Sequence, residues 1–376
     1  MKQTSLFTAL HGQSSASAPI SSECRLAEYR GAATAANFGD SDREFQALRS
    51  GCGLYDLGFR TKISLTGNDR VRWLNGMVSN KIKDLPEGQG VYAFVLNVQG
   101  HILGDLYAYN RGESLVIDTD HSQLEKILGV FKRYIIMDKV EVKDLSDELT
   151  AIGLVGPRSR EVLQAAGIEV PEMLGLQAIT PRCDCACDCL ECTLVRGDAP
   201  GVSYELWISS GEVKKVWDAL VAAGATPTGS EALEKSRIVS GIPLYGVDIR
   251  ERELPQETDQ MRALNFQKGC YIGQEIVERI RSRGNVHRKF TGFVCDGAAP
   301  IAPGDKVVLA EKEIGEITSV TTLREPGGNS TVALGYIRRE IGSAGREVTI
   351  GTHSAHVTEL PLTTNARNAE HAVAHQ

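Results

Sequence analysis

The stretch Lys62-Ile63-Ser64-Leu65-Thr66-Gly67 is the first sign of a repeat in this chain, because a similar apolar pattern occurs again at Ala151-Ile152-Gly153-Leu154-Val155-Gly156. Both stretches are followed by the same order of predicted elements: a helix, a β-hairpin and a second helix. In the first segment these elements lie at 69–77, 102–118 and 124–131, and in the second at 158–166, 193–208 and 213–221. An order of elements that occurs twice indicates two pseudo-repeated halves. We therefore predict an α+β fold in which helices cover antiparallel or mixed sheets.

The chain after Gly284 has a different sequence pattern, with short apolar runs separated by turns that contain Gly, Pro and charged residues. The turns Pro303-Gly304-Asp305 and Pro326-Gly327-Gly328-Asn329 are strong breaks between strands. The runs predict strands at 290–295, 306–309, 315–322, 331–337 and 347–350, and a further one at 356–360. Closing these short strands into a small antiparallel β-barrel hides their edges.

These patterns divide the chain into five expected segments. They are an N-terminal lead and helix at 1–50, a first α+β half at 51–145, a second α+β half at 146–283, a C-terminal β-barrel at 284–362 and a disordered tail at 363–376.

Composition and charge exclude several classes of function. The chain has 376 residues, 42% hydrophobic and 24% charged, and a formal net charge of -7. An acidic chain has no general footprint for nucleic acid, so we expect no direct sequence-specific nucleic-acid binding. No apolar run reaches the length that spans a bilayer, and the N-terminal stretch 1–24 is a poor signal peptide. We expect a cytoplasmic monomer that does not bind membranes.

A cysteine lies between two glycines in Lys268-Gly269-Cys270-Tyr271-Ile272-Gly273-Gln274-Glu275. Apolar residues at helical spacing after Cys270 predict a loop that leads into a helix. The exposed amide donors of a helix N-terminus, with Lys268 nearby, favour a thiolate. The alternative is that Cys270 is a small buried hydrophobic residue and that the glycines only shape the turn.

This motif resembles the signature of the folate-binding YgfZ-like proteins, a branch of the superfamily that includes the aminomethyltransferase (T-protein) of the glycine cleavage system. Leu254-Pro255-Gln256-Glu257, Arg283-Gly284 and Arg288-Lys289 fit the same pattern. The resemblance implies two pseudo-repeated domains around a central folate cavity, followed by the barrel. It also implies tetrahydrofolate, or a one-carbon derivative of it, as the ligand.

Two carboxylates are the first candidates that the resemblance places in the folate site. Glu205 lies on a strand face shared with Ser203 and Trp207, where a carboxylate can accept hydrogen bonds from the pterin. The alternative is an exposed carboxylate beside a solvent-facing Trp207. Asp105 follows Gly104 and matches an essential aspartate of the aminomethyltransferases, where it can assist proton movement. Its alternative is a turn-capping aspartate, and Gly104 stands where T-proteins often carry a second acidic residue.

Other residues are assigned to the same ligand by the resemblance. Arg237 matches an arginine associated with folate binding, and Tyr245 matches an aromatic residue that can wall the pterin. Lys268 joins Glu205, Arg237, Asp105 and Tyr245 as a predicted cofactor-binding residue, and Cys270 and Asp105 are the predicted catalytic residues. An ordinary helix-surface arginine is the alternative for Arg237.

Five of the nine cysteines gather in a second feature, namely Cys183, Cys185, Cys187, Cys189 and Cys192. Their crowding does not fit a secreted disulfide framework. Only Cys189 and Cys192 have C-x-x-C spacing, so a structural zinc site is not indicated. We interpret the segment as a hairpin insertion, with a soft metal as the alternative occupant.

The leading hypothesis is a tetrahydrofolate-binding protein that supports iron-sulfur cluster assembly or repair and affects tRNA modification through iron-sulfur enzymes. Its partners would be a reduced folate and iron-sulfur client or assembly proteins. The first alternative is a folate-dependent aminomethyltransferase, and the second is a metal-handling module built on the cysteine-rich segment. The sequence leaves open whether the protein turns over a substrate.

Overall fold

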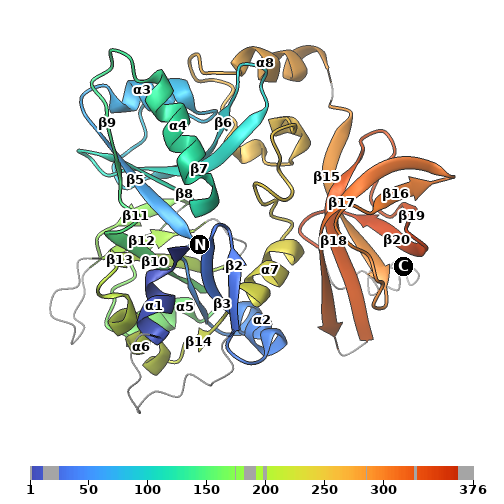
Figure 1. Cartoon of the computed structure of the whole chain (residues 1–376), viewed down its shortest axis with the longest axis horizontal. Coiled ribbons are helices and arrows are strands. Elements are labelled where there is room, and N and C mark those ends of the chain that lie inside the picture. Colours follow the sequence, from blue (N-terminus) through green and yellow to red (C-terminus); the bar gives the residue numbers. More distant parts are fainter. Residues whose placement is uncertain are drawn as a thin grey trace. The chain divides into compact units, whose positions relative to one another are not determined.

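The computed structural model describes residues 2–11, 25–173, 175–181, 192–197, 201–284, 286–325 and 328–362 (Figure 1). These residues form two compact units. The first runs to residue 233 and includes 262–278, and the second consists of 234–261 with the chain from 279 onward. Of the expected segments, the tail at 363–376 and most of the cysteine-rich stretch lie outside the described residues.

One sheet of the first unit holds the first predicted half. Its strand order is β6-β7-β8-β5-β9, with β5 at Arg60–Thr66, β6 at Gly90–Leu96, β7 at Ile102–Asn110, β8 at Leu115–Asp120 and β9 at Glu141–Asp144. Helices α3 (Arg70–Met77) and α4 (Leu124–Tyr134) cover one face of this sheet, where their apolar residues join one core (Figure 1). The predicted hairpin is confirmed as β7 and β8.

The second sheet has the order β11-β12-β13-β10-β4-β14. Its strands are β4 at Gly53–Asp56, β10 at Leu149–Val155, β11 at Gln177–Ile179, β12 at Thr193–Arg196, β13 at Ser203–Ser209 and β14 at Thr226–Pro227. Helices α1 (Ser5–His11), α5 (Ser159–Ala165) and α6 (Val213–Ala222) contribute to the core on one face of it. A small sheet of β1 (Lys2–Gln3), β3 (Ala32–Asn37) and β2 (Arg25–Tyr29), and helix α2 (Ser41–Ser50), complete this part.

Two segments depart from the expected boundaries. Residues 53–56 lie in the segment expected as the first half, yet they form strand β4, which pairs with β10 and β14 in the second sheet. The segment 262–278, expected with the second half, packs on the first half: Asn265 donates to the carbonyl of Ser79, and Ile272 to that of Gly76. Strand pairing and packing, rather than order along the chain, decide where each segment belongs.

The second unit contains the barrel. Six antiparallel strands close in the order β15-β18-β17-β16-β19-β20, namely β15 at Arg288–Asp296, β16 at Lys306–Leu309, β17 at Lys312–Glu325, β18 at Gly328–Arg338, β19 at Glu347–Ile350 and β20 at His353–Thr358. Along the chain, two boundaries between the units fall within helices α7 (Ser230–Val239) and α8 (Gln274–Arg283). Short 3₁₀ turns lie at Pro255–Glu257 and Met261–Ala263. The α+β class and the closed barrel are confirmed.

Candidate functional site

Asp105 lies on the face of β7 that points away from the apolar core, and both of its carboxylate oxygens are held. Tyr92 Oη donates to Oδ2 at 2.6 Å, and Gln123 Nε2 donates to Oδ1 at 2.7 Å. Gln123 Oε1 in turn accepts the backbone N–H of Asp105 at 2.9 Å. A Cβ at Gly104 would lie 2.9 Å from that same Gln123 oxygen, so the glycine makes room for the clamp. Asp105 is therefore fixed inside the sheet and is no turn cap.

Cross-strand ion pairs stand beside Asp105 on the same sheet. The register of β5 and β8 sets Arg60 opposite Asp120 and Lys62 opposite Asp118. Arg60 Nη1 lies 3.0 Å from Asp120 Oδ1, and Lys62 Nζ lies 2.9 Å from Asp118 Oδ1. Arg60 also reaches Asp118 at 2.8 Å. Opposite charges directly across an antiparallel pair stabilise each other, and Lys62, Asp118 and Asp120 are buried.

Glu205 lies on the inner face of β13, opposite the core residues Tyr204, Leu206 and Ile208. Trp207 Nε1 donates to Glu205 Oε2 at 3.0 Å, and Trp207 is only 2% exposed. The alternative of a solvent-facing Trp207 is therefore wrong. Gly153 pairs with Glu205 on one side and with Tyr55 on the other, and a Cβ there would lie 2.3 Å from the Tyr55 ring. The glycine lets the Tyr55 ring cross β10 toward Glu205.

Side chains from the inner faces of the two sheets contact one another. Lys62 Nζ, from the first sheet, lies 5.0 Å from the ring centroid of Trp207, from the second. The ring of Tyr109 on β7 meets Trp207 edge to face at 5.2 Å. A chain of contacts thus runs from Asp118 through Lys62 and Trp207 to Glu205. The charge of Arg60 acts on both partly exposed carboxylates, Asp105 and Glu205, and we refer to these residues together as the polar region between the sheets.

Burial and charge set the protonation of this region. Burial, with the charge of Asp118, raises the pKa of Glu205, and Lys62 and Arg60 partly oppose that rise. Burial also raises the pKa of Asp105, aided by Asp120 and opposed by the hydrogen bonds from Tyr92 and Gln123. Burial acts on Asp118 in the same sense, yet Arg60 and Lys62 outweigh it and lower the pKa of Asp118. The region therefore holds the firmly ionised carboxylate of Asp118 together with those of Asp105 and Glu205, which take up protons more readily.

The glycine-flanked motif is anchored by its lysine. Lys268 Nζ donates to the carbonyl oxygens of Asn75, Val78 and Asn80 at 2.6, 2.5 and 2.7 Å, at the C-terminal end of α3. Burial lowers the pKa of Lys268 to about 7, while the three carbonyl acceptors favour its ammonium form. The buried Lys268 side chain thus fixes the loop, and its placement among cofactor-binding residues stays a prediction.

Cys270 follows on that loop as an exposed free thiol. The alternative of a buried hydrophobic residue is therefore wrong. The same segment reaches the Asp105 region through Arg262, whose guanidinium lies 4.2 Å from the ring centroid of Tyr92. The ring hydroxyl of Tyr92 is the one that donates to Asp105.

Arg237 and Tyr245 lie in the second unit. The buried Arg237 guanidinium binds Asp248 Oδ2 and the carbonyl of Ile242, each at 2.6 Å, and Ser319 Oγ at 2.7 Å. It is thus no surface arginine, and its contacts organise the chain around the barrel. Tyr245 is half-buried in the loop after α7. Their predicted roles toward folate remain predictions.

The soft-metal alternative has no support. No group of three or more His, Cys, Asp or Glu side chains in the described ranges could hold a metal ion. Cys183, Cys185, Cys187 and Cys189 lie outside those ranges. Cys192 is described, and it is buried in the core of the second half.

Comparison with known proteins identifies the family. A model of the GCVT N-terminal domain matches residues 21–268, and a model of the glycine cleavage T-protein C-terminal barrel domain matches residues 288–363. The chain belongs to the GCVT family.

Individual members of the GCVT family are distant but cover most of the chain. An aminomethyltransferase of Rubrobacter xylanophilus is 28% identical over 348 residues, which is 92% of both chains. A chloroplastic Arabidopsis thaliana protein, named only as a transferase, is 27% identical and matches 86% of this chain and 74% of its own length. The crystal structure of the glycine cleavage aminomethyltransferase T of Bartonella henselae has a TM-score of 0.81 at 21% identity, covering 90% of this chain and 94% of that one. This last likeness establishes the fold.

Sequence reasoning missed the polar and charged residues around the two carboxylates in this GCVT fold. They are Arg60, Lys62, Asp118, Tyr92, Gln123 and Arg262. A signal for some of them was present, because Arg60 and Lys62, like Asp118 and Asp120, stand two residues apart on their strands and therefore share a face. When one face of a strand packs in the apolar core and the other carries charges, the charged face indicates a polar inner surface.

In the described part of the chain, no helix is long and apolar enough to cross a membrane.

Proposed function

We propose that this protein binds a reduced folate between the inner faces of its two sheets and transfers a one-carbon unit, as an aminomethyltransferase does. Membership of the GCVT family and the aminomethyltransferases among its relatives support this function. The observation that carries the proposal is that the charge of Arg60 acts on both Asp105 and Glu205, each partly exposed and each from a different sheet.

The donors and acceptors present fit a reduced folate. Glu205 Oε2 accepts from Trp207, while Oε1 has no partner among the described residues. A free carboxylate oxygen beside a buried indole can accept the N–H donors of a pterin. The buried aromatic rings of Tyr109 and Trp207 supply apolar surface next to it. When bound, tetrahydrofolate would supply the nitrogen atoms that receive the one-carbon unit.

Asp105 has a different role in this proposal. Its two oxygens are fixed by Tyr92 and Gln123, so its carboxylate keeps one orientation. A fixed negative charge stabilises positive charge that develops next to it, and the raised pKa of Asp105 suits a group that accepts and returns a proton. We assign Asp105 to catalysis and Glu205 to binding.

Asp105→Asn tests this assignment by keeping the shape of the side chain and removing its charge. The assay measures methylenetetrahydrofolate, and the ammonia released with it, formed from tetrahydrofolate and an aminomethyl donor. We expect Asp105→Asn to abolish formation and Cys270→Ser to leave it almost unchanged. Full activity of Asp105→Asn would contradict the proposal.

The second candidate function is the YgfZ-like role in maintaining iron-sulfur enzymes. One observation favours it: Cys270 is an exposed free thiol on a loop that Lys268 anchors. This role predicts that cells lacking the protein lose activity of iron-sulfur enzymes, and that wild type but not Cys270→Ser restores it. Equal restoration by both proteins would leave the transferase as the better account.

A further inference from the structure

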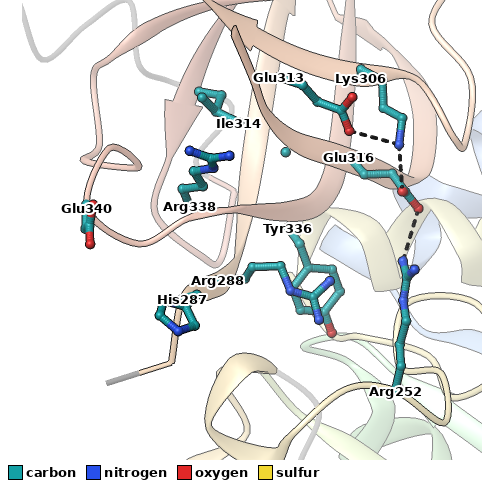
Figure 2. Close-up of a pocket in the computed structure, with 11 residues that line it drawn as sticks. Arg252, His287, Arg288, Lys306, Glu313, Ile314, Glu316, Tyr336, Arg338 and Glu340 are labelled. Carbon is teal, nitrogen blue, oxygen red and sulfur yellow. Dashed lines mark hydrogen bonds and ion pairs between the residues drawn. The ribbon is translucent and has the colours of Figure 1, made fainter. Parts of the chain in front are cut away.

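The second unit contains a pocket of about 820 Å³ at one side of the barrel (Figure 2). Its lining comes from the starts of β15, β16 and β17, the end of β18 and the loop at Arg252. A volume of this size accommodates a small organic molecule. All of its lining residues lie within the second unit, and none of them is a residue assigned to the folate site.

Most carboxylates of this pocket are already neutralised. Glu316 lies 3.1 Å from Lys306 and 2.9 Å from Arg250, which lower its pKa against the effect of burial. Glu313 lies 3.1 Å from the same Lys306 (Figure 2). Glu340 is the exception among the lining carboxylates, and it is exposed at the edge. Few hydrogen-bond acceptors therefore remain free in the pocket.

Hydrogen-bond donors, in contrast, remain unused on three arginines. The exposed Arg338 has no hydrogen bond or ion pair to any described side chain, and Figure 2 shows its guanidinium beside Ile314. Arg288 is held through Nε and Nη2 by Glu257 and lies over the ring of Tyr336 at 5.1 Å, which leaves Nη1 free. Arg252 donates through Nε to Glu253, and its Nη2 lies 3.6 Å from Glu316, so its Nη1 is also free to donate.

An excess of guanidinium donors over free acceptors selects for a ligand rich in oxygen acceptors. The guanidinium fork matches the geometry of phosphate and carboxylate oxygens and can bind them with two parallel hydrogen bonds. Arg288 and Arg252 are oriented by carboxylates behind them, so binding would cost little side-chain ordering there. We propose that this pocket binds a small organic oxyanion, either a phosphate ester or a polycarboxylate, with Arg338 as its principal ligand and Arg288 and Arg252 as supports.

Calorimetric titration of the full chain with two probes, pyrophosphate and citrate, tests this site and separates the two sources. At least one probe should bind saturably with one site per chain, and the tighter probe identifies the class. Because a charge-assisted bidentate contact is lost, we expect Arg338→Gln to weaken binding by about tenfold or more. Arg338 is exposed and unpaired with described residues, so this substitution should not disturb folding.

Arg339→Gln is the matched control, because it removes the same charge from the adjacent exposed residue, which does not line the pocket. It should bind the probe as wild type does. Two results would overturn the proposal: neither probe binds the wild type saturably, or both variants weaken binding equally, which would indicate only a general attraction to positive charge.

Discussion

The two carboxylates of the candidate site are held in different ways. Asp105 has both oxygens engaged, by Tyr92 and Gln123, and keeps one orientation. Glu205 has one oxygen engaged by Trp207, while the other has no partner in the described chain. The carboxylate of Asp105 is thus fixed, whereas that of Glu205 can still accept hydrogen bonds from a ligand.

The protonation of Glu205 should control folate binding. Burial and Asp118 raise the pKa of Glu205, so it takes up a proton at a higher pH than an exposed glutamate, whose pKa is about 4.3. Since the ionised form accepts the N–H donors, affinity for tetrahydrofolate should be full above this raised pKa and fall as the pH is lowered through it. Calorimetric titrations from neutral pH downward measure this, and an affinity that does not change over the range would contradict it.

Lys62 should be a strong contributor to stability. Its side chain is fully buried and pairs with Asp118, so Lys62→Met leaves Asp118 with Arg60 alone. Loss of one partner from a buried ion pair predicts a fall of about 3 kcal/mol in the free energy of unfolding. The control is Lys143→Met, because Lys143 and Glu148 form an exposed pair and should change that energy by less than about 1 kcal/mol. Urea unfolding of both variants compares them, and similar losses would show that burial of the pair is unimportant.

At this scale, sequence alternation predicted which way Glu205 points but not what meets it. Alternation along one strand fixes the two faces, and Glu205 indeed lies opposite Leu206. The pairing of Lys62 with Asp118 depends on the register between β5 and β8, and the contact of Lys62 with Trp207 depends on how two sheets pack. Neither is encoded in a local pattern.

At the scale of elements, the crossing of β10 by the Tyr55 ring requires a glycine. In Gly153→Ala the added methyl would lie 2.3 Å from the ring, so Tyr55 must move. We expect a loss of about 2 kcal/mol in the free energy of unfolding, typical of overpacking. Gly129→Ala is the control: no atom lies within 4 Å of the new Cβ on the exposed side of α4, and alanine should stabilise the helix by about 0.5–1 kcal/mol. In thermal unfolding, the melting temperature should fall for Gly153→Ala and rise for Gly129→Ala relative to wild type. A change in the same direction for both variants would contradict this prediction.

The loop of Cys270 should depend on the end of α3. Lys268→Met removes three hydrogen bonds to carbonyls there, and we expect a loss of about 3 kcal/mol, since bonds to a charged donor are strong but not additive. Backbone amides at 268–273 should exchange hydrogen faster in this variant, while those of the barrel strand β18 should keep their protection. Unchanged exchange at 268–273 would show that other contacts hold the loop.

The barrel strands were the elements most readily predicted. The ranges 306–309 and 347–350 match β16 and β19, because turn residues bound each short run closely. Strands β4 and β6 were not predicted. β4 has only four residues, and its partners β10 and β14 lie far along the chain. Such pairing is decided by tertiary structure.

At the scale of the molecule, the repeat predicted two halves but not the exchange of segments between them. β4 joins the sheet of the second half, and 262–278 returns to pack on the first. The second exchange adds a charged group to the candidate site, since Arg262 reaches the Tyr92 that holds Asp105. Sequence order alone does not show that the segment of the Cys270 motif contacts the first half.

We propose that the inner faces of the two sheets bind a reduced folate through Glu205. Anaerobic calorimetric titration of wild type and Glu205→Gln with tetrahydrofolate tests it most directly. We predict saturable binding to the wild type and, with one charge-assisted acceptor lost, an affinity about tenfold lower for Glu205→Gln, whose urea unfolding shows it folded. Absence of binding to the wild type, or equal affinity of the two proteins, would contradict the claim.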